Sequence, residues 1–205
     1  MKTHFSYDAG FKTIVCEQMP YLLTTGVFNP SSPKQTQQYN MQAFDHRIKQ
    51  LKMAHARVLL AWAGVNTITS CILIFMTEAA LFYFYAMNVC WGIVNTVVAA
   101  FIFYHHNHVF KKPLTLLQQM DYQRHAEKMI LFNIGLDIAF VAVGSALYQQ
   151  AYASIGGYIV LWKGFGAAVM MQGTFLCIQD SLFYWLHSKN RQKIYPLWQR
   201  MTENL

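Results

Sequence analysis

Four long apolar stretches, separated by short polar or basic segments, constrain this 205-residue sequence more than any other feature. They cover about residues 54–76, 81–104, 129–148 and 161–187. Each is long enough to cross a hydrocarbon core of about 30 Å as an α-helix rising about 1.5 Å per residue. Charged residues make up only 12% of the chain, against about 25% in ordinary soluble domains. The sequence therefore predicts an all-α integral membrane four-helix bundle, with the lipid bilayer as its partner.

The residues outside the four stretches predict two flanking segments. Residues 1–40 contain three prolines and no continuous apolar run, so we expect an irregular cytoplasmic segment without a signal peptide. From Met41 to the first stretch, apolar residues recur on one side of a helix, which predicts an amphipathic segment that leads into the membrane. Residues 189–205 predict a basic cytoplasmic tail.

Basic residues predict the orientation of the bundle. Three blocks flank the stretches: Lys49, Lys52 and Arg57; Lys111, Lys112, Arg124 and Lys128; and Lys189, Arg191, Lys193 and Arg200. Because Lys and Arg concentrate in cytoplasmic segments, we expect both termini in the cytoplasm, with the chain in a bacterial cytoplasmic (inner) membrane. The net charge of +7 comes from these blocks, so we expect anionic headgroups, and not nucleic acid, to face them.

Each apolar stretch carries strongly polar side chains at membrane depth. They are Asn66 and Ser70, Asn88 and Asn95, Asn133 and Asp137, and Gln172 and Asp180. Their spacing places the polar residues of each stretch on one face of a helix. Ionisable groups at this depth cost about 2.5–3.5 kcal/mol on insertion scales, so we expect these faces to point into the bundle.

The depth of these polar residues in the membrane predicts that some of them form one common layer. Counted from the expected cytoplasmic ends, four groups lie about 12–14 Å inside: Asn66, Asn95, Asp137 and Asp180. Two carboxylic acids at one level of low dielectric cannot both ionise cheaply. The pair could share a proton, bind a cation with nearby amide oxygens, or donate to the amides. Trp91 lies between Asn88 and Asn95, where it could line a polar cavity or fill the core.

Histidines form a second candidate site near the expected cytoplasmic ends of the stretches. They are His55, His106, His125 and His187. Neutral imidazoles from several helices could hold a transition metal or a haem iron. The competing interpretation is histidine at headgroup level, and no His-x-x-x-His pair lies within a stretch. The sequence identifies no cofactor.

Four short motifs carry a family resemblance. They are Trp62-x-x-x-Asn66; Met87-Asn88-x-x-Trp91-x-x-Val94-Asn95; Asn133-x-Gly135-Leu136-Asp137; and Gln172-Gly173-x-Phe175-Leu176-x-x-x-Asp180. Over about residues 53–187, the chain resembles a family of uncharacterised bacterial multi-pass membrane proteins with a domain of unknown function. The resemblance implies that the polar positions recur as motifs, and it brings no activity with it. One departure is Gly92, where the family pattern has Asn after the Trp.

The sequence is compatible with three functions, and it does not decide whether the chain is an enzyme. The polar layer could bind or relay a proton, a cation or a small polar ligand. Four helices are few for a transporter, so that function would favour a homo-oligomer. Alternatively, the layer could fix helix packing in a structural or assembly protein. The third possibility is a membrane redox protein that binds a metal or haem through the histidines.

Overall fold

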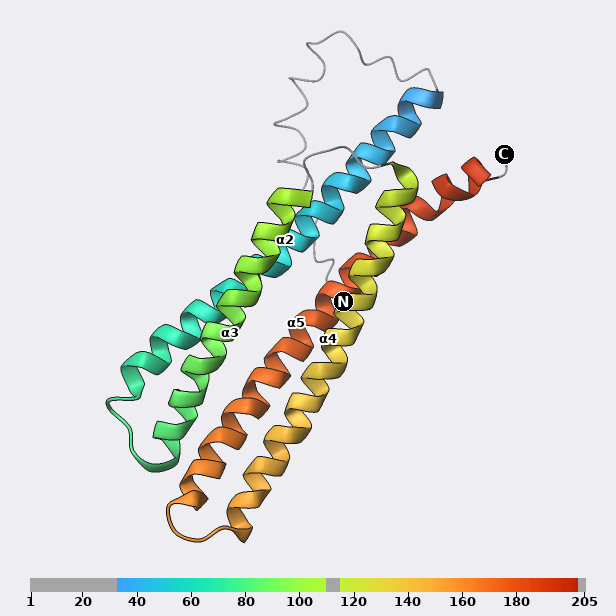
Figure 1. Ribbon diagram of the computed structural model, residues 1–205. Helices are drawn as coiled ribbons and strands as arrows, with labels where there is room; N and C mark the ends of the chain where they lie inside the picture. Colours follow the sequence, from blue (N-terminus) through green and yellow to red (C-terminus); the bar gives the residue numbers. More distant parts are fainter. Residues whose placement is uncertain (1–32, 110–114, 203–205) are drawn as a thin grey trace, which may run out of the picture. The chain divides into compact units, whose positions relative to one another are not determined.

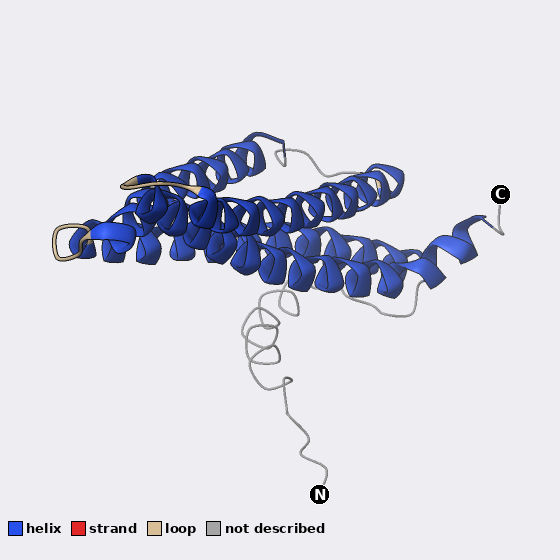
Figure 2. Ribbon diagram, turned by 90° about the horizontal axis from the view of Figure 1, so that it is seen from below, coloured by secondary structure: helices blue, strands red, loops and turns tan. Residues whose placement is uncertain are grey.

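A computed structural model describes residues 33–109 and 115–202, and the described residues form helices and turns without any strand (Figures 1 and 2). The elements are α2 (Pro33–Leu73), α3 (Ala79–Val109), α4 (Leu116–Gln150), the 3-10 helix η1 (Ala151–Ala153) and α5 (Tyr158–Thr202). The predicted all-α four-helix bundle is confirmed. Contacts divide the chain into two units, residues 1–41 and 42–205, and the packing described below is that of the second unit.

All four long helices contain a segment that is long and apolar enough to cross a membrane. These segments are Met41–Leu73, Ala79–His105, Leu117–Ala153 and Tyr158–Pro196. The helices have 31 to 45 residues, or about 47–68 Å at 1.5 Å per residue. They are therefore longer than a hydrocarbon core of about 30 Å requires.

All four helices begin earlier than the sequence predicted, and α3, α4 and α5 also end later. The prediction of an irregular segment over residues 1–40 is wrong for residues 33–40, which belong to α2. Proline is well tolerated in the first turn of a helix, because its missing N–H has no partner there. Residues 1–32 lie outside the described part of the chain. The basic tail continues α5 as helix to Thr202 and is no separate element.

Consecutive helices of the bundle run in opposite directions. Residues 74–78 join α2 to α3, and residues 151–157 join α4 to α5. Both connections lie at the same end of the bundle, which we call the hairpin end (Figure 1). At the other end, which we call the terminal end, α3 stops, α4 starts and α5 stops. Gly156 has a φ of 65° in the second connection, a left-handed conformation that glycine adopts without steric cost.

A seven-residue repeat accounts for the packing of α4 against α5. Buried positions that follow this repeat are Gln123, Ile130, Asp137 and Gly144 in α4, and Gly166, Gly173, Asp180, His187 and Ile194 in α5. A repeat of seven keeps one stripe of each helix facing its neighbour with a left-handed twist. The same repeat carries the polar residues of the candidate site, so helix packing itself turns them inward.

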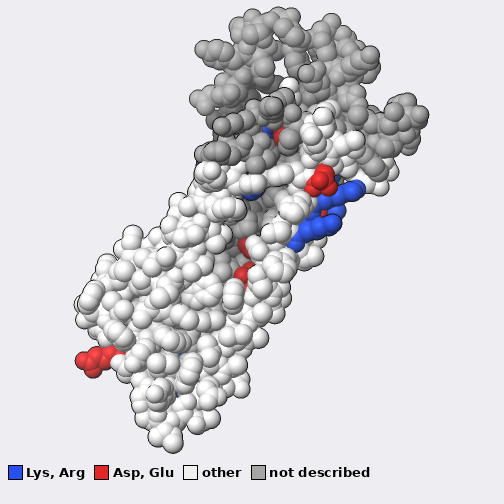
Figure 3. Space-filling model, viewed as in Figure 1, with Lys and Arg blue, Asp and Glu red and all other residues white. Residues whose placement is uncertain are grey.

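Large apolar side chains cover the outside of the four spans. Only 17% to 33% of each apolar window is buried inside the protein, and residues such as Val65, Phe101 and Ile178 are more than 60% exposed. On the face shown in Figure 3, Lys and Arg gather toward the terminal end, and the half nearest the hairpin end is almost entirely uncharged. A continuous apolar surface of this extent needs lipid around it. The chain is a membrane protein.

Candidate functional site

Hydrogen bonds between polar groups join three helices inside the protein. We call this set of hydrogen bonds the amide relay. Trp62 Nε1 of α2 donates to Gln172 Oε1 of α5 at 2.9 Å. Gln172 Nε2 donates to Asn88 Oδ1 of α3 at 2.8 Å, and Asn66 Nδ2 donates to the Asn88 carbonyl oxygen at 3.2 Å. Gln172 and Asn88 are 0% and 1% exposed. The polar faces of α2, α3 and α5 therefore meet inside the protein.

Trp62 contributes both a ring contact and a donor to the relay, so its two roles can be separated. Its ring stacks on Phe175 with centroids 3.7 Å apart. Trp62→Phe keeps an aromatic ring but leaves Gln172 Oε1 without its donor. We expect a loss of about 1–3 kcal/mol in the free energy of unfolding, measured by denaturation in mixed detergent micelles. Trp185→Phe, which changes a half-exposed ring on α5, should cost less than about 0.5 kcal/mol; equal losses would show that the donor is unimportant.

A histidine–carboxylate pair lies closer to the terminal end than the relay does. His55 Nε2 of α2 is 2.8 Å from Asp180 Oδ1 of α5, and their side chains are 12% and 7% exposed. The His55 ring also stacks on Phe183, with centroids 4.5 Å apart. Asp180 follows Gln172 by eight residues, which is about 12 Å along the helix. The pair thus fixes α2 to α5 at a second level.

Asp137 and Asn95 are buried side chains that each present an unpaired polar atom. Both are 4% exposed, and neither Asp137 Oδ2 nor Asn95 Nδ2 has a hydrogen-bond partner. Their helices meet at Trp91 and Phe140, whose rings are 4.9 Å apart. Asn95 follows Trp91 by four residues, and Asp137 precedes Phe140 by three. Asn95 and Asp137 therefore lie about one helical turn closer to the terminal end than the two rings do, and on the same helix faces as those rings.

The backbones of Asp137 and Asp180 lie at different levels of the bundle, and a single layer of their carboxylates stays a prediction. A Cβ on Gly173 of α5 would lie 2.8 Å from the Asp137 carbonyl oxygen, so Asp137 lies near the level of the relay. Asp180 lies seven residues further along α5, or about 10 Å. The two groups still interact electrostatically. The predicted depths were counted from assumed cytoplasmic ends of the spans, and the helices extend past those ends by different lengths.

The remaining predicted site residues are less enclosed. Asn133, one turn before Asp137 in α4, is half-buried, and so is Trp91. Because Trp91 packs edge-on against Phe140, its ring forms part of the α3–α4 contact beside Asn95.

Two of the four predicted histidines turn into the bundle. His55 pairs with Asp180, and His187 is 2% exposed. His125 is exposed, and the side chain of His106 lies outside the described part of the structure. Among the described residues, no three His, Cys, Asp or Glu side chains are grouped so that they could hold a metal ion. The structure therefore does not bring the predicted histidines together as one ligand set.

A polar network at the terminal end escaped the sequence analysis. Gln123 Nε2 donates to the His187 carbonyl oxygen at 2.8 Å and to Glu127 Oε1 at 2.9 Å, and Arg191 Nη1 lies 3.3 Å from Glu127 Oε2. Gln123 and Glu127 precede the predicted third span, so they were not considered as site residues. The seven-residue spacing back from Asp137 through Ile130 to Gln123 is the signal that would have found them.

Gly92 marks a close contact between α2 and α3. A Cβ at this position would run into the Thr67 side chain. The Asn that the family pattern has after the Trp therefore does not fit between the helices as they pack in this chain. The departure from the pattern is explained by the side chain opposite.

Comparisons with known proteins found one family that matches the chain. A family of unknown function (DUF6992) has a sequence model that matches residues 58–181. This range includes the relay, Asp137 and Asp180. No curated protein and no solved structure is significantly similar to the chain. Because the match covers more than half of its 205 residues, the chain belongs to this family of unknown function.

Proposed function

We propose that the chain binds a proton reversibly at Asp137, inside the bilayer, and exchanges it with water at the terminal end through Asp180, His55 and His187. The observation that carries the proposal is the buried Asp137 carboxylate, which has an oxygen without a hydrogen-bond partner. Buried carboxylates in membrane spans are costly, and they are retained where they bind or pass ions and protons. An unpaired oxygen is free to take a proton or to accept from a bound water.

Protonatable side chains form a column from Asp137 toward the terminal end. Gly173 of α5 lies opposite Asp137. Asp180 and His187 come seven and fourteen residues after Gly173 in α5, so their backbones are spaced by about 10 Å toward the terminal end. His55 contacts Asp180. Imidazole has two ring nitrogens, so it can accept a proton at one and donate from the other. Where two of these side chains do not meet directly, a water molecule can bridge them.

The charged groups around this column come from all four helices. Lys52 of α2 interacts electrostatically with His105 of α3 and with His187 of α5. At the terminal end, Glu127 of α4 pairs with Arg191 of α5. The terminal end of the column therefore combines one ion pair with the positive charge of Lys52.

The column has no equivalent toward the hairpin end. Beyond the relay, the described helices contain no buried carboxylate or imidazole. Trp62 stacks on Phe175 at the relay, and beyond it Gly144 and Gly166 bring the backbones of α4 and α5 into contact. This asymmetry supports a proton-binding site that is open to one side, and not a channel through the membrane.

The same proposal assigns the terminal end to the cytoplasm of a bacterial inner membrane. The assignment is supported by the three basic blocks of the sequence, which all belong to segments at or beyond that end. Protons would then be taken up from the cytoplasm.

Proton uptake by the purified protein tests the proposed function. When detergent-solubilised protein is moved from mildly alkaline to mildly acidic pH, Asp137→Asn should take up about one proton per chain fewer than wild type, measured with a pH indicator in weak buffer. Asp121→Asn is the matched control, because Asp121 is an exposed carboxylate on the same helix. Equal uptake by wild type and Asp137→Asn would refute the proposal.

The amide relay favours a second role for the polar positions, which is to fix the register of the helices. Each relay bond joins different helices and lies within 3.2 Å, as expected of interhelical hydrogen bonds that stabilise packing. This role needs no titration of Asp137, so the uptake experiment separates it from proton binding.

A further inference from the structure

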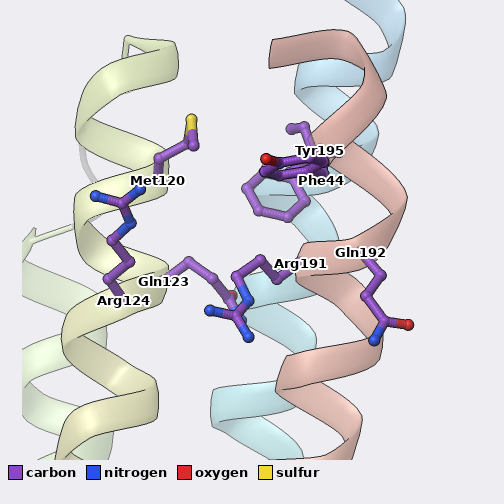
Figure 4. A pocket seen from close by; sticks show the side chains of 8 residues that line it. Phe44, Met120, Gln123, Arg124, Arg191, Gln192 and Tyr195 are labelled. Carbon is purple, nitrogen blue, oxygen red and sulfur yellow. The ribbon is translucent and has the colours of Figure 1, made fainter. Parts of the chain in front are cut away.

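A pocket of about 270 Å³ lies between α4 and α5 at the terminal end, apart from the proton column (Figure 4). Its lining includes Phe44, Met120, Gln123, Arg124, Arg191, Gln192, Ile194 and Tyr195. Ligand pockets commonly have about 300–1,000 Å³. This volume therefore suits a small group, such as a phosphate with a short carbon portion.

Two guanidinium groups border the pocket from opposite helices. Arg191 reaches from α5 toward α4, and Arg124 extends from α4 (Figure 4). Arg191 pairs with Glu127 at 3.3 Å, whereas Arg124 forms no ion pair with any described residue. A guanidinium has five N–H donors, so Arg191 can hold Glu127 and still donate to a ligand. The lining itself contains no acidic residue.

The inner wall of the pocket combines a fixed polar group with an apolar surface. Gln123 is 1% exposed, and its amide is held by the His187 carbonyl oxygen and by Glu127. Phe44 and Ile194 are 0% and 4% exposed, and both line the pocket together with Tyr195. The pocket therefore offers positive charge at its rim and apolar contact within.

The position of the pocket along α5 matches the headgroup level of a bilayer. Trp185 is half-exposed, and Lys189 Nζ lies 3.8 Å from the centre of its ring. Exposed tryptophan and lysine at the end of an apolar span are typical of the membrane interface. Arg191 follows Trp185 by six residues, which is about 9 Å beyond that level, where lipid phosphates lie.

We propose that this pocket binds a phosphate group, with Arg124 and Arg191 donating to its oxygens and the apolar wall contacting the carbons attached to it. Arginine pairs with phosphate through two parallel hydrogen bonds, and basic pockets between membrane helices are suited to anionic headgroups. An anionic phospholipid and a soluble organic phosphate present the same chemistry. The proposal is independent of proton binding at Asp137.

Titration of purified protein in an uncharged detergent tests this site. The probes are short-chain phosphatidylglycerol, short-chain phosphatidylcholine and glycerol 3-phosphate, with binding followed by calorimetry. Arg124→Gln should weaken binding of the phosphatidylglycerol about tenfold or more, since a charge-assisted hydrogen bond is lost. It leaves the pair between Arg191 and Glu127 in place. Lys128→Gln, one turn away on α4 and exposed, is the matched control and should change affinity less than about twofold.

The three probes separate the possible sources of the phosphate. Saturable binding of phosphatidylglycerol alone, with loss in Arg124→Gln, identifies a lipid headgroup site. Binding of glycerol 3-phosphate with the same loss identifies a soluble organic phosphate, and both results support the proposal. Two results would overturn it: no saturable binding of either anionic probe, or equal losses in Arg124→Gln and Lys128→Gln, which would mean general attraction to surface charge.

Discussion

Gly166→Ala is expected to destabilise the bundle by about 1–3 kcal/mol, because the added methyl group has no space between two backbones. A Cβ at this position would lie 2.5 Å from Tyr148 N and 2.7 Å from the Gly144 carbonyl oxygen. Both are backbone atoms, so no side chain can rotate away and α4 must move off α5. The loss should appear in the free energy of unfolding in mixed micelles.

Gly135→Ala provides the control for this prediction. Gly135 lies on α4, and a Cβ there would meet nothing within 4 Å. Alanine is favoured over glycine in a helix by about 0.5–1 kcal/mol, so this variant should be as stable as wild type or more so. If both alanine variants were neutral, α4 and α5 would not approach as closely as described.

His55→Leu should cost about 3–5 kcal/mol of unfolding free energy, the largest effect that we expect of a single side chain. Interhelical hydrogen bonds in membranes contribute only about 0.6 kcal/mol on average. The larger value is expected here because the variant leaves Asp180, which is 5% exposed, as a buried carboxylate without its partner at 2.8 Å.

The double variant His55→Leu/Asp180→Leu separates the cost of an unpaired charge from the cost of altered packing. Replacing both members of a buried pair by apolar residues is often neutral or stabilising. We therefore expect the double variant to recover most of the stability lost in His55→Leu. Additive losses in the two single variants would show that the residues act independently, against the contact seen between α2 and α5.

The architecture was predictable because apolar length and helical periodicity are local properties of a sequence. The four stretches, their polar faces and the inward position of Asp137 and Asp180 all follow from spacing along one helix. The helix ends did not follow, because α2 and α5 continue through polar residues whose helical state depends on packing beyond the apolar core. The predicted start of the first helix at Met41 was late for this reason.

Partners across helices could not be read from spacing within one helix. The relative depth of Asp137 and Asp180 depends on how far α4 is shifted along α5, and the contact at Gly173 sets that shift. The pairing of His55 with Asp180 likewise depends on the position of α2. Gln123 and Glu127 were missed because the third span was predicted to begin near residue 129, although α4 begins at Leu116.

Infrared difference spectroscopy of the protein in lipid nanodiscs, recorded between mildly alkaline and mildly acidic pH, asks directly whether Asp137 takes up a proton within the membrane. Protonation of a buried carboxylate produces a carboxylic acid C=O band. We expect wild type and Asp121→Asn to show such a band and Asp137→Asn to lack it. A band that persists unchanged in Asp137→Asn, or its absence from wild type, would contradict proton binding at this side chain.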